Sequence, residues 1–427
     1  MTDLAHPRDA ILATMDRIYR YRMTTTSGGN ISLRDEAGDV WITPARLDKG
    51  ALRRTDVVRV RASGDFEGDI RPSSELPFHQ AIYAARPDIR AIVHAHPAAL
   101  VAFSMARMTP ETRLFPQSWH VCGEPGFAPY ALPGSAKLGE NIAEQFRRGY
   151  NAVVLENHGV VVGAGTLAEA FQRFEALEFV AQTAIRARTL GEARALSPKE
   201  LDLPQQRRLD FRGVPRAAPS SNERELRRQV SEFVRRGCQQ RLLISTEGSF
   251  SASLSAEEFL ITPSQQDRFQ VGPQDLVWVR GDDCELGRQP SRASRCHQAI
   301  YAKHPDVQAI CFAHPVHATA FSVTGTSLDS RTIPESYIVL RDIARIPFGL
   351  PYQNGAAVAD LVSARQPAAL LDHDGVLVLG ASVLDAFDRL EVMEATAEAL
   401  IFSRRIGEAS PMPDRVIAEL RDHFLKD

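Results

Sequence analysis

Cysteine is scarce in this sequence, and its five cysteines form no Cys-x-x-Cys pair. Neither a disulfide framework nor a cysteine-ligated zinc site is therefore indicated, and a reducing, cytoplasmic location is expected. No apolar run approaches the roughly 18 residues that a transmembrane helix needs. Because residues 1–20 carry charges throughout, we expect a mature helix at this end of the chain and not a signal peptide.

The chain also has little net charge. The formal value of -3 gives no reason to expect a nucleic-acid or membrane partner, so a small-molecule substrate is the expected partner. Hydrophobic residues make up 44% of the sequence and charged residues 24%, which is typical of a globular protein. With 427 residues the chain is too long for one ordinary core, so two domains are expected.

A short apolar run, residues 91–93, leads into His94-Ala95-His96. A run of this length with a β-branched pair is typical of a buried strand, and Pro97 ends the ladder. Residues two apart on a strand point to the same face, so His94 and His96 present two imidazoles side by side. Two imidazoles at a strand end make half of a zinc site.

A third imidazole follows in a turn between two apolar strands, at His158-Gly159. With His94 and His96 it would form a three-histidine site with an open fourth position, the pattern of a catalytic zinc. The alternative is that these are hydrogen-bonded core or surface histidines. Glu75, at the first turn of the helix that precedes the His94 strand, can face the same cleft.

The polar loop at residues 24–30, TTTSGGN, leads into another strand. Such a loop offers backbone N–H groups, small side chains and room for an anion. It is equally compatible with a flexible entry to a hairpin.

Five motifs in this order resemble the class II aldolase/adducin family over residues 8–190. They are Gly29-Asn30-Ile31-Ser32, Trp41-Ile42-Thr43-Pro44, PSSE at 72–75, VHAHP at 93–97 and ENHG at 156–159. The resemblance implies a three-layer αβα domain around a mixed, mostly antiparallel sheet. It also implies a divalent metal, usually zinc, on His94, His96 and His158, with Glu75 as the acid/base.

The resemblance further implies a lyase that cleaves a C–C bond of a hydroxy-carbonyl compound, possibly a sugar phosphate, through a metal-stabilised enediolate. The family's aldolases carry Glu at position 75 and its 4-epimerase carries Asp, so Glu75 favours an aldolase. Dehydratases, epimerases and decarboxylases with the same metal set remain alternatives, as does a non-catalytic, adducin-like assembly module. Family aldolases are cyclic tetramers, so we expect a homo-oligomer, a dimer or a multiple of it.

Two departures from the family pattern affect the expected substrate site. Ala45-Arg46 replaces the Thr-Gly that helps to hold the phosphate, and Arg46 either binds a phosphate or carboxylate or is a solvated loop residue. His120 stands where the aldolases have a proton-donating tyrosine, in a stretch (109–135) whose Pro and Gly predict irregular structure. The remaining residues of the substrate cradle are Gly29, Asn30, Ser73 and Ser74.

The second half repeats the first. His297-Gln298-Ala299-Ile300-Tyr301-Ala302 matches residues 79–84 with an offset of 218, and Ile261-Thr262-Pro263 matches residues 42–44 with an offset of 219. A near-constant offset indicates tandem duplication of one domain. We therefore expect a catalytic domain over 1–198, a polar, proline-bearing linker over 199–220 and a second domain over 221–427.

The duplicate lacks most of the expected chemistry. Ala293 aligns with Glu75, Phe312 with His94 and Asp374 with His158, although His314 keeps the place of His96. Gly29-Asn30 aligns with about Ser249-Phe250. A remodelled site through His373 is the alternative to a metal-free structural domain. The remaining histidines, among them His79 and His297, are interpreted as ordinary helix or surface residues.

Overall fold

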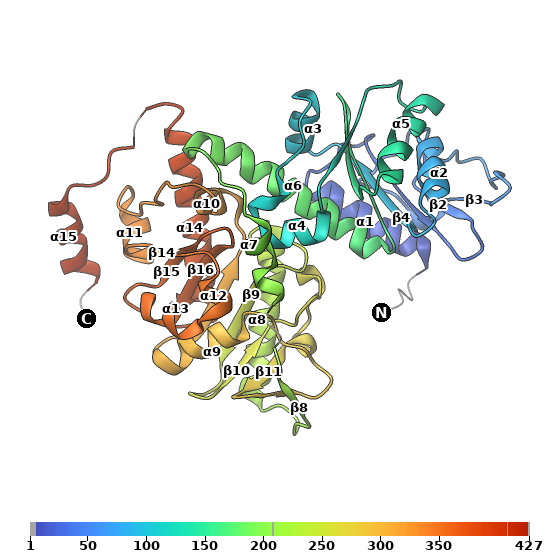
Figure 1. Cartoon of the computed structure of the whole chain (residues 1–427). Helices are drawn as coiled ribbons and strands as arrows, with labels where there is room; N and C mark the ends of the chain where they lie inside the picture. Colours follow the sequence, from blue (N-terminus) through green and yellow to red (C-terminus); the bar gives the residue numbers. More distant parts are fainter. Residues whose placement is uncertain (1–5, 207–208, 408, 426–427) are drawn as a thin grey trace. The chain divides into compact units, whose positions relative to one another are not determined.

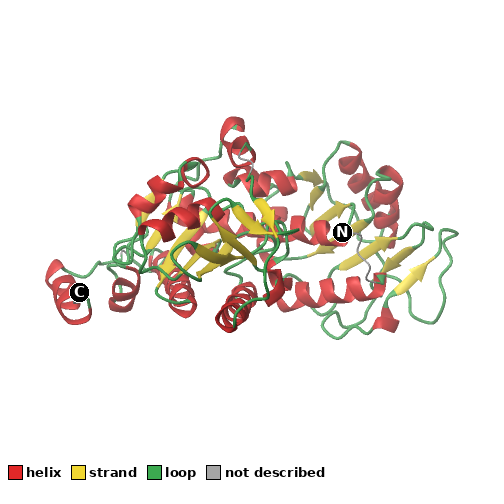
Figure 2. Cartoon of the chain, turned by 90° about the horizontal axis from the view of Figure 1, so that it is seen from below, coloured by secondary structure: helices red, strands yellow, loops and turns green. Residues whose placement is uncertain are grey.

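The computed structural model describes residues 6–206, 209–407 and 409–425. The chain forms two compact units: Met1–Thr112 with Gln117–Gln182, and Arg113–Pro116 with Thr183–Asp427. Both are α/β units, each built on its own sheet (Figures 1 and 2). In the described part of the chain, no helix is both long and apolar enough to cross a membrane.

The first unit is built on a seven-stranded sheet in the order β3-β2-β1-β4-β7-β6-β5. All neighbouring strands are antiparallel except β5 and β6, which are parallel. This confirms the mixed, mostly antiparallel sheet. The strands are β1 (Asn30–Arg34), β2 (Val40–Ile42), β3 (Val58–Val60), β4 (Ala91–Ala95), β5 (Gly126–Ala128), β6 (Ala152–Leu155) and β7 (Gly159–Ala164).

Helices lie on both faces of this sheet. Side chains of α2 and α5, such as Phe78 and Ile142, share a buried core with Ile42, Ile92 and Val161. Ile31 and Val93 project to the other face, because successive strand residues alternate, and α1 and α3 contact the sheet as well. The helices are α1 (Pro7–Arg20), α2 (Leu76–Ala85), α3 (Ala98–Met105), α4 (Pro116–Cys122), α5 (Ala136–Arg147) and α6 (Leu167–Leu190), with 3-10 turns at Arg54–Asp56 and Thr112–Leu114.

The sheet of the second unit repeats this strand order and extends it. Its order is β14-β15-β16-β13-β9-β10-β11-β12-β8, in which the first seven strands correspond to those of the first unit. The duplication predicted from the sequence is confirmed at the level of topology. The strands are β8 (Arg212–Val214), β9 (Ser249–Ser253), β10 (Glu258–Ile261), β11 (Val277–Arg280), β12 (Asp283–Glu285), β13 (Ala309–Ala313), β14 (Ala344–Ile346), β15 (Ala368–Leu371) and β16 (Gly375–Gly380).

The helices of the second unit begin with the short α7. They are α7 (Pro198–Asp202), α8 (Ser221–Gln239), α9 (Ser294–Lys303), α10 (Val316–Ser322), α11 (Pro334–Leu340), α12 (Leu350–Gln353), α13 (Gly355–Leu361), α14 (Val383–Ser403) and α15 (Asp414–Phe424). Three 3-10 turns complete it, at Leu203–Gln205, Arg268–Gln270 and Pro273–Asp275.

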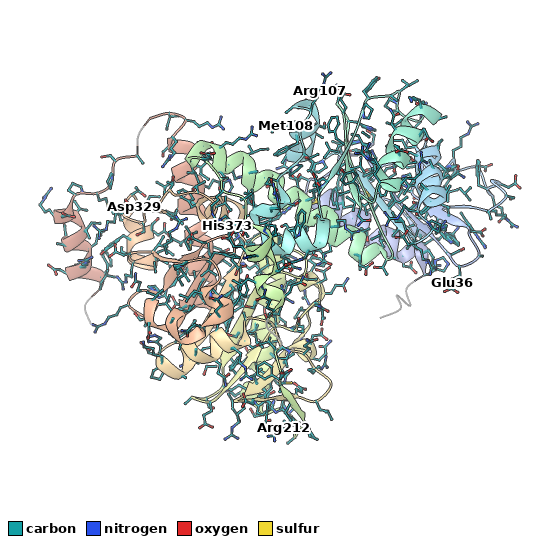
Figure 3. The ribbon with its side chains drawn as sticks, in the orientation of Figure 1. Glu36, Arg107, Met108, Arg212, Asp329 and His373 are labelled. Carbon is teal, nitrogen blue, oxygen red and sulfur yellow. The ribbon has the colours of Figure 1, made fainter. Side chains whose placement is uncertain are left out.

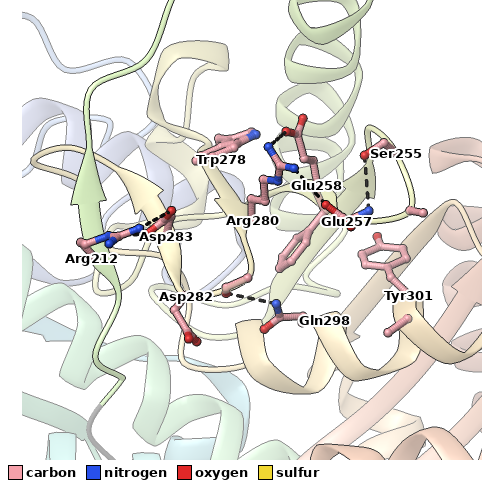
Figure 4. Close-up of a pocket in the computed structure, with 14 residues that line it drawn as sticks. Arg212, Ser255, Glu257, Glu258, Trp278, Arg280, Asp282, Asp283, Gln298 and Tyr301 are labelled. Carbon is pink, nitrogen blue, oxygen red and sulfur yellow. Dashed lines mark hydrogen bonds and ion pairs between the residues drawn. The ribbon is translucent and has the colours of Figure 1, made fainter.

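A hollow of about 630 Å³ lies at the β8 edge of this second sheet (Figure 4). Arg212 of β8 forms two hydrogen bonds to Asp283 of β12, at 2.7 and 2.9 Å, and Arg280 contacts Glu257 at 3.0 Å. Both arginines that line the hollow are therefore paired with carboxylates, and the lining keeps an excess of acidic side chains.

Three local expectations are corrected. The stretch 109–135 is not irregular, because it contains α4 and β5. The polar stretch 199–220 carries most of α7 and the edge strand β8, although residues 207–208 of it lie outside the described residues. Finally, strand register places Ser249 opposite Phe312, as Asn30 lies opposite His94, so Gly248-Ser249 is the counterpart of Gly29-Asn30.

Candidate metal centre

The centre of the first sheet positions His94. Strand β4 lies between β1 and β7, with His94 opposite Asn30 on one side and Val161 on the other. The His94 side chain is fully buried, and its Nδ1 lies 2.9 Å from the carbonyl oxygen of Val160. That carbonyl can only accept, so Nδ1 carries the proton and Nε2 keeps a lone pair. A backbone contact of this kind orients metal-ligating histidines.

His96 follows the end of β4, where its ring packs against two glycines. Its Nε2 lies 3.0 Å from Nε2 of His94. A Cβ added to Gly159 would come within 2.6 Å of the His96 ring, and one added to Gly28 within 3.0 Å of its Nδ1. Both positions must therefore be glycine for the imidazole to take this place.

His158 lies in the turn between β6 and β7. Its backbone N–H donates to the carbonyl of Leu155 at 3.0 Å, and Asn157 before it takes a positive φ of 53°. An ion pair of 2.6 Å between Arg107 and Glu156 connects this turn to the residues after α3 (Figure 3). The hydrogen bond within the turn and the ion pair from Arg107 therefore hold the backbone that carries the His158 imidazole.

Glu75 occupies the N-cap position of α2, and its carboxylate reaches the histidines. Oε2 accepts a hydrogen bond of 2.8 Å from Asn30 and lies 3.2 Å from Nε2 of His94, and Oε1 lies 3.4 Å from Nε2 of His158. Oε1 is buried and accepts no hydrogen bond in the described part of the chain. Burial alone would raise the pKa of Glu75, but the charge and hydrogen bonding of His94, together with His158 and Asn30, hold it well below its usual range.

The three predicted ligands come together. One nitrogen from each of His94, His96 and His158 lies within 4.8 Å of the others, and among the described residues this is the single group of this kind. Burial and the neighbouring His94 lower the pKa of His96 to about 3 and that of His158 to about 4. These two imidazoles are neutral near pH 7 and offer lone pairs, as metal ligation requires. Three imidazole nitrogens beside a carboxylate fit a divalent transition metal.

The predicted substrate residues differ in their exposure and in their backbone conformation. Gly29 has a φ of 71°, and a Cβ there would approach the His94 carbonyl oxygen to 2.7 Å. Ser73 is buried and its hydroxyl accepts from the N–H of Glu75, whereas Ser74 is exposed. Arg46 is exposed and has a φ of 56°, so it keeps the left-handed backbone that suits the glycine of the expected Thr-Gly. His120 is half-buried on α4.

A family model, the class II aldolase and adducin N-terminal domain, matches residues 9–185 and again 228–401. The chain belongs to this family. The first segment contains every strand of the first sheet and the second contains β9 to β16 of the second sheet, so the class II aldolase fold occurs twice.

Relatives within the class II aldolase family match about half of the chain. A 5-deoxy-D-ribulose 1-phosphate aldolase of Bacillus thuringiensis is 33% identical over 47% of this chain and 93% of its own length. A 3-oxo-tetronate 4-phosphate decarboxylase of Pectobacterium atrosepticum is 35% identical over 37% of this chain and 74% of its own. A solved structure of an L-fuculose 1-phosphate aldolase is 30% identical, with a TM-score of 0.43, and covers 48% of this chain and 97% of that one.

Two polar residues of this class II aldolase domain were not singled out from the sequence. His79 lies on helix α2, as expected, but it is fully buried and hydrogen-bonded and is not a surface histidine. Lys49 is also buried: its ammonium donates to the carbonyl of Pro44 at 2.6 Å, and burial lowers its pKa. Arg268 makes the same contact to Pro263, at 2.8 Å. Lys49 and Arg268 each lie five residues after the proline of an Ile-Thr-Pro motif. This repeated cation could have identified Lys49 from the sequence.

The corresponding cleft of the second class II aldolase domain is built differently. His314 Nε2 lies 3.8 Å from Asp374, and the hydroxyl of Tyr352 donates to that carboxylate at 2.6 Å. Tyr352 follows Leu350-Pro351 as Gly134 follows Leu132-Pro133, so a tyrosine replaces a glycine beside the lost ligands. His373 is buried, with Nδ1 2.9 Å from the Leu114 carbonyl oxygen.

Proposed function

We propose that the first domain is a zinc-dependent lyase of aldolase type. In this proposal His94, His96 and His158 hold the metal, and Glu75 is the acid/base. The substrate is a hydroxy-carbonyl compound with an anionic end, a sugar phosphate by analogy with the relatives named above. One observation supports the proposal most: a buried carboxylate oxygen with no hydrogen bond faces a cluster of three imidazoles.

The metal, when bound, would polarise the substrate's carbonyl and hydroxyl oxygens and stabilise the negative charge that develops on them. The chain's own residues supply the proton transfer. Asn30 holds one carboxylate oxygen of Glu75, Oε2, so the other, Oε1, is available to take a proton and return it to carbon.

The anionic end of the substrate is assigned to the loop on the other side of Asn30. Gly29 supplies a close backbone approach, Ser73 and Ser74 supply hydroxyls, and exposed Arg46 supplies a guanidinium that can bind a phosphate or carboxylate in a bidentate manner. His120 is proposed to exchange the proton of the substrate hydroxyl that becomes the released carbonyl: it takes this proton during cleavage and donates it in the reverse, aldol-forming direction. The second domain is proposed to be structural, and the enzyme to be a homo-oligomer.

The test is a screen of purified, zinc-loaded protein against ketose 1-phosphates and 3-oxo acid phosphates, with separate detection of released aldehyde and released CO₂. Release of aldehyde supports the aldolase proposal. Release of CO₂ without aldehyde would contradict it and favour a decarboxylase, the activity named for a 35% identical relative. On the true substrate, Glu75→Gln should retain zinc and lose turnover by about 10²–10⁴-fold. Near-wild-type turnover of the metal-replete variant would remove Glu75 from the mechanism.

A further inference from the structure

A continuous chain of buried hydrogen bonds leads from the interior of the first domain to Glu75. Tyr83 OH lies 2.7 Å from Ser32 Oγ, which lies 2.7 Å from Nδ1 of His79. Nε2 of His79 lies 2.5 Å from Oδ1 of Asn30, and Nδ2 of Asn30 donates to Glu75 at 2.8 Å. The chain joins α2, which carries His79 and Tyr83 one turn apart, to alternate residues of β1.

The carboxylate at one end sets the direction of every bond in this chain. An ionised carboxylate only accepts, so the Asn30 amide must turn its nitrogen to Glu75 and its oxygen to His79. Nε2 of His79 must then carry the proton, and Nδ1 must accept from the Ser32 hydroxyl. Ser32 in turn accepts from Tyr83, so all donors point toward Glu75. Hydrogen bonds aligned in this way strengthen one another.

His79 reinforces the orientation that the carboxylate sets for the Asn30 amide. Without a donor at Nε2, the amide could rotate and present its oxygen to the carboxylate, which would place two acceptors against each other. Burial lowers the pKa of His79 to about 3, and the nearby His94 adds to this, so the imidazole is neutral and keeps one defined donor.

The second domain keeps most of this chain without the carboxylate. Tyr301, Ser251 and His297 repeat the contacts at 2.7 and 2.7 Å, and Nε2 of His297 lies 2.9 Å from Oγ of Ser249. Ser249 takes the place of Asn30, and Ala293 takes the place of Glu75. The contribution of the histidine to folding can therefore be measured in this copy, separately from any effect on Glu75.

We propose that His79 is a positioning residue for the reaction: it fixes the Asn30 amide, which in turn holds Oε2 of Glu75 and directs Oε1 to the substrate. This inference rests on the proposed function, because it gives Glu75 its role. In this inference Asn30 binds Glu75 and not the anionic end, which is left to Gly29, Ser73, Ser74 and Arg46, so His79 is predicted to affect turnover and not substrate affinity.

The experiment compares four variants in full-length, zinc-loaded protein: His79→Gln, His79→Asn, His79→Phe and, as the matched control, His297→Phe. Glutamine can place a donor near Nε2, whereas asparagine reaches only the Nδ1 position and phenylalanine supplies neither. We expect kcat to fall about ten- to a hundredfold in the Asn and Phe variants with KM unchanged, and to be largely restored in the Gln variant. His297→Phe should lower the midpoint of urea unfolding as His79→Phe does and leave kcat unchanged.

A second readout does not depend on activity. The side-chain amide signals of Asn30, identified in ¹⁵N NMR spectra of metal-free protein by their loss in Asn30→Ser, should shift in His79→Asn and stay in place in His297→Phe. Equal kcat in the Gln and Asn variants, or unmoved Asn30 signals, would overturn the positioning role even if His79→Phe fails to fold. An inactive wild type with the expected NMR shifts would refute the proposed function and leave the hydrogen-bonded chain intact.

Discussion

Each chain should bind one zinc ion, and the double variant His94→Ala/His96→Ala should lose it. The double variant removes two of three nitrogens that converge within 4.8 Å in the first domain. The second domain offers only His314 and Asp374 at the corresponding positions, 3.8 Å apart, and Phe312 has no ligand atom where His94 has one.

The expected loss of affinity can be estimated from the number of ligands. Structural zinc sites with four ligands bind with about 10–16 kcal/mol, or roughly 2.5–4 kcal/mol per ligand. Two imidazoles are therefore worth about 5–8 kcal/mol, which corresponds to a weakening of roughly 10⁴–10⁶-fold. Zinc binding in the second domain should be weaker still. The Tyr352 hydroxyl already donates a hydrogen bond to the Asp374 carboxylate, and this bond would have to be given up.

Plasma emission spectrometry of extensively dialysed protein measures the bound metal directly. We expect about one equivalent of zinc in the wild type, about one in His314→Ala and less than a tenth in the double variant, with circular dichroism confirming that all three are folded. If the double variant retains close to one tightly bound equivalent, the second domain has its own site and the single-site interpretation is wrong.

Three further outcomes are expected. Arg46→Ala should raise KM for the true substrate more than it lowers kcat, and unchanged kinetics would mean that Arg46 is only a solvated loop residue. The protein should be a dimer or a multiple of one, with an interface well above ~1,000 Å², so a monomer at micromolar concentration by light scattering would contradict this. Burial lowers the pKa of His297 to about 3 from its usual 6.5, so the unfolded state gains a proton first on acidification and stability falls from pH 6.5 downward. His297→Gln should reduce the slope of unfolding free energy against pH between 4 and 6 by about 1.4 kcal/mol per pH unit, and an unchanged slope would refute this.

The histidine cluster was accessible from the sequence because strand and turn patterns mark its members, whereas the fold class was expected from the resemblance to the class II aldolase/adducin family. The period of two along a strand places His94 and His96 on one face, and glycine beside His158 marks the turn that brings the third imidazole in. The helix limits 98–105 and 167–190 agree with the apolar spacing. The strand order agrees in the two halves, as a duplication requires.

Contacts that depend on the packing of distant segments were not accessible in the same way. His79 follows a strong helical pattern, and the sequence does not show that its ring meets Ser32 and Asn30 on a strand almost 50 residues earlier. Pro and Gly in 109–135 predicted loops, but tertiary packing there stabilises a helix and a strand, which overrides local propensity. The expected match of Gly29-Asn30 with Ser249-Phe250 was also one residue away from the strand register, which pairs Gly29 with Gly248.

In the second domain, two of the residues at the positions of the proposed metal ligands contact each other, and one of them contacts a nearby tyrosine. The half-buried aspartate in the place of His158 has partners of its own, because Tyr352 donates to it and His314 lies beside it. Tyr352 stands where the first domain has Gly134. The Tyr301–Ser251–His297 contacts are present in the second domain although no carboxylate corresponds to Glu75. Their role in this domain is therefore to stabilise the packing of α9 on β9. In the first domain the same scaffold continues through Asn30 to Glu75, which connects a fold-stabilising contact to the proposed acid/base.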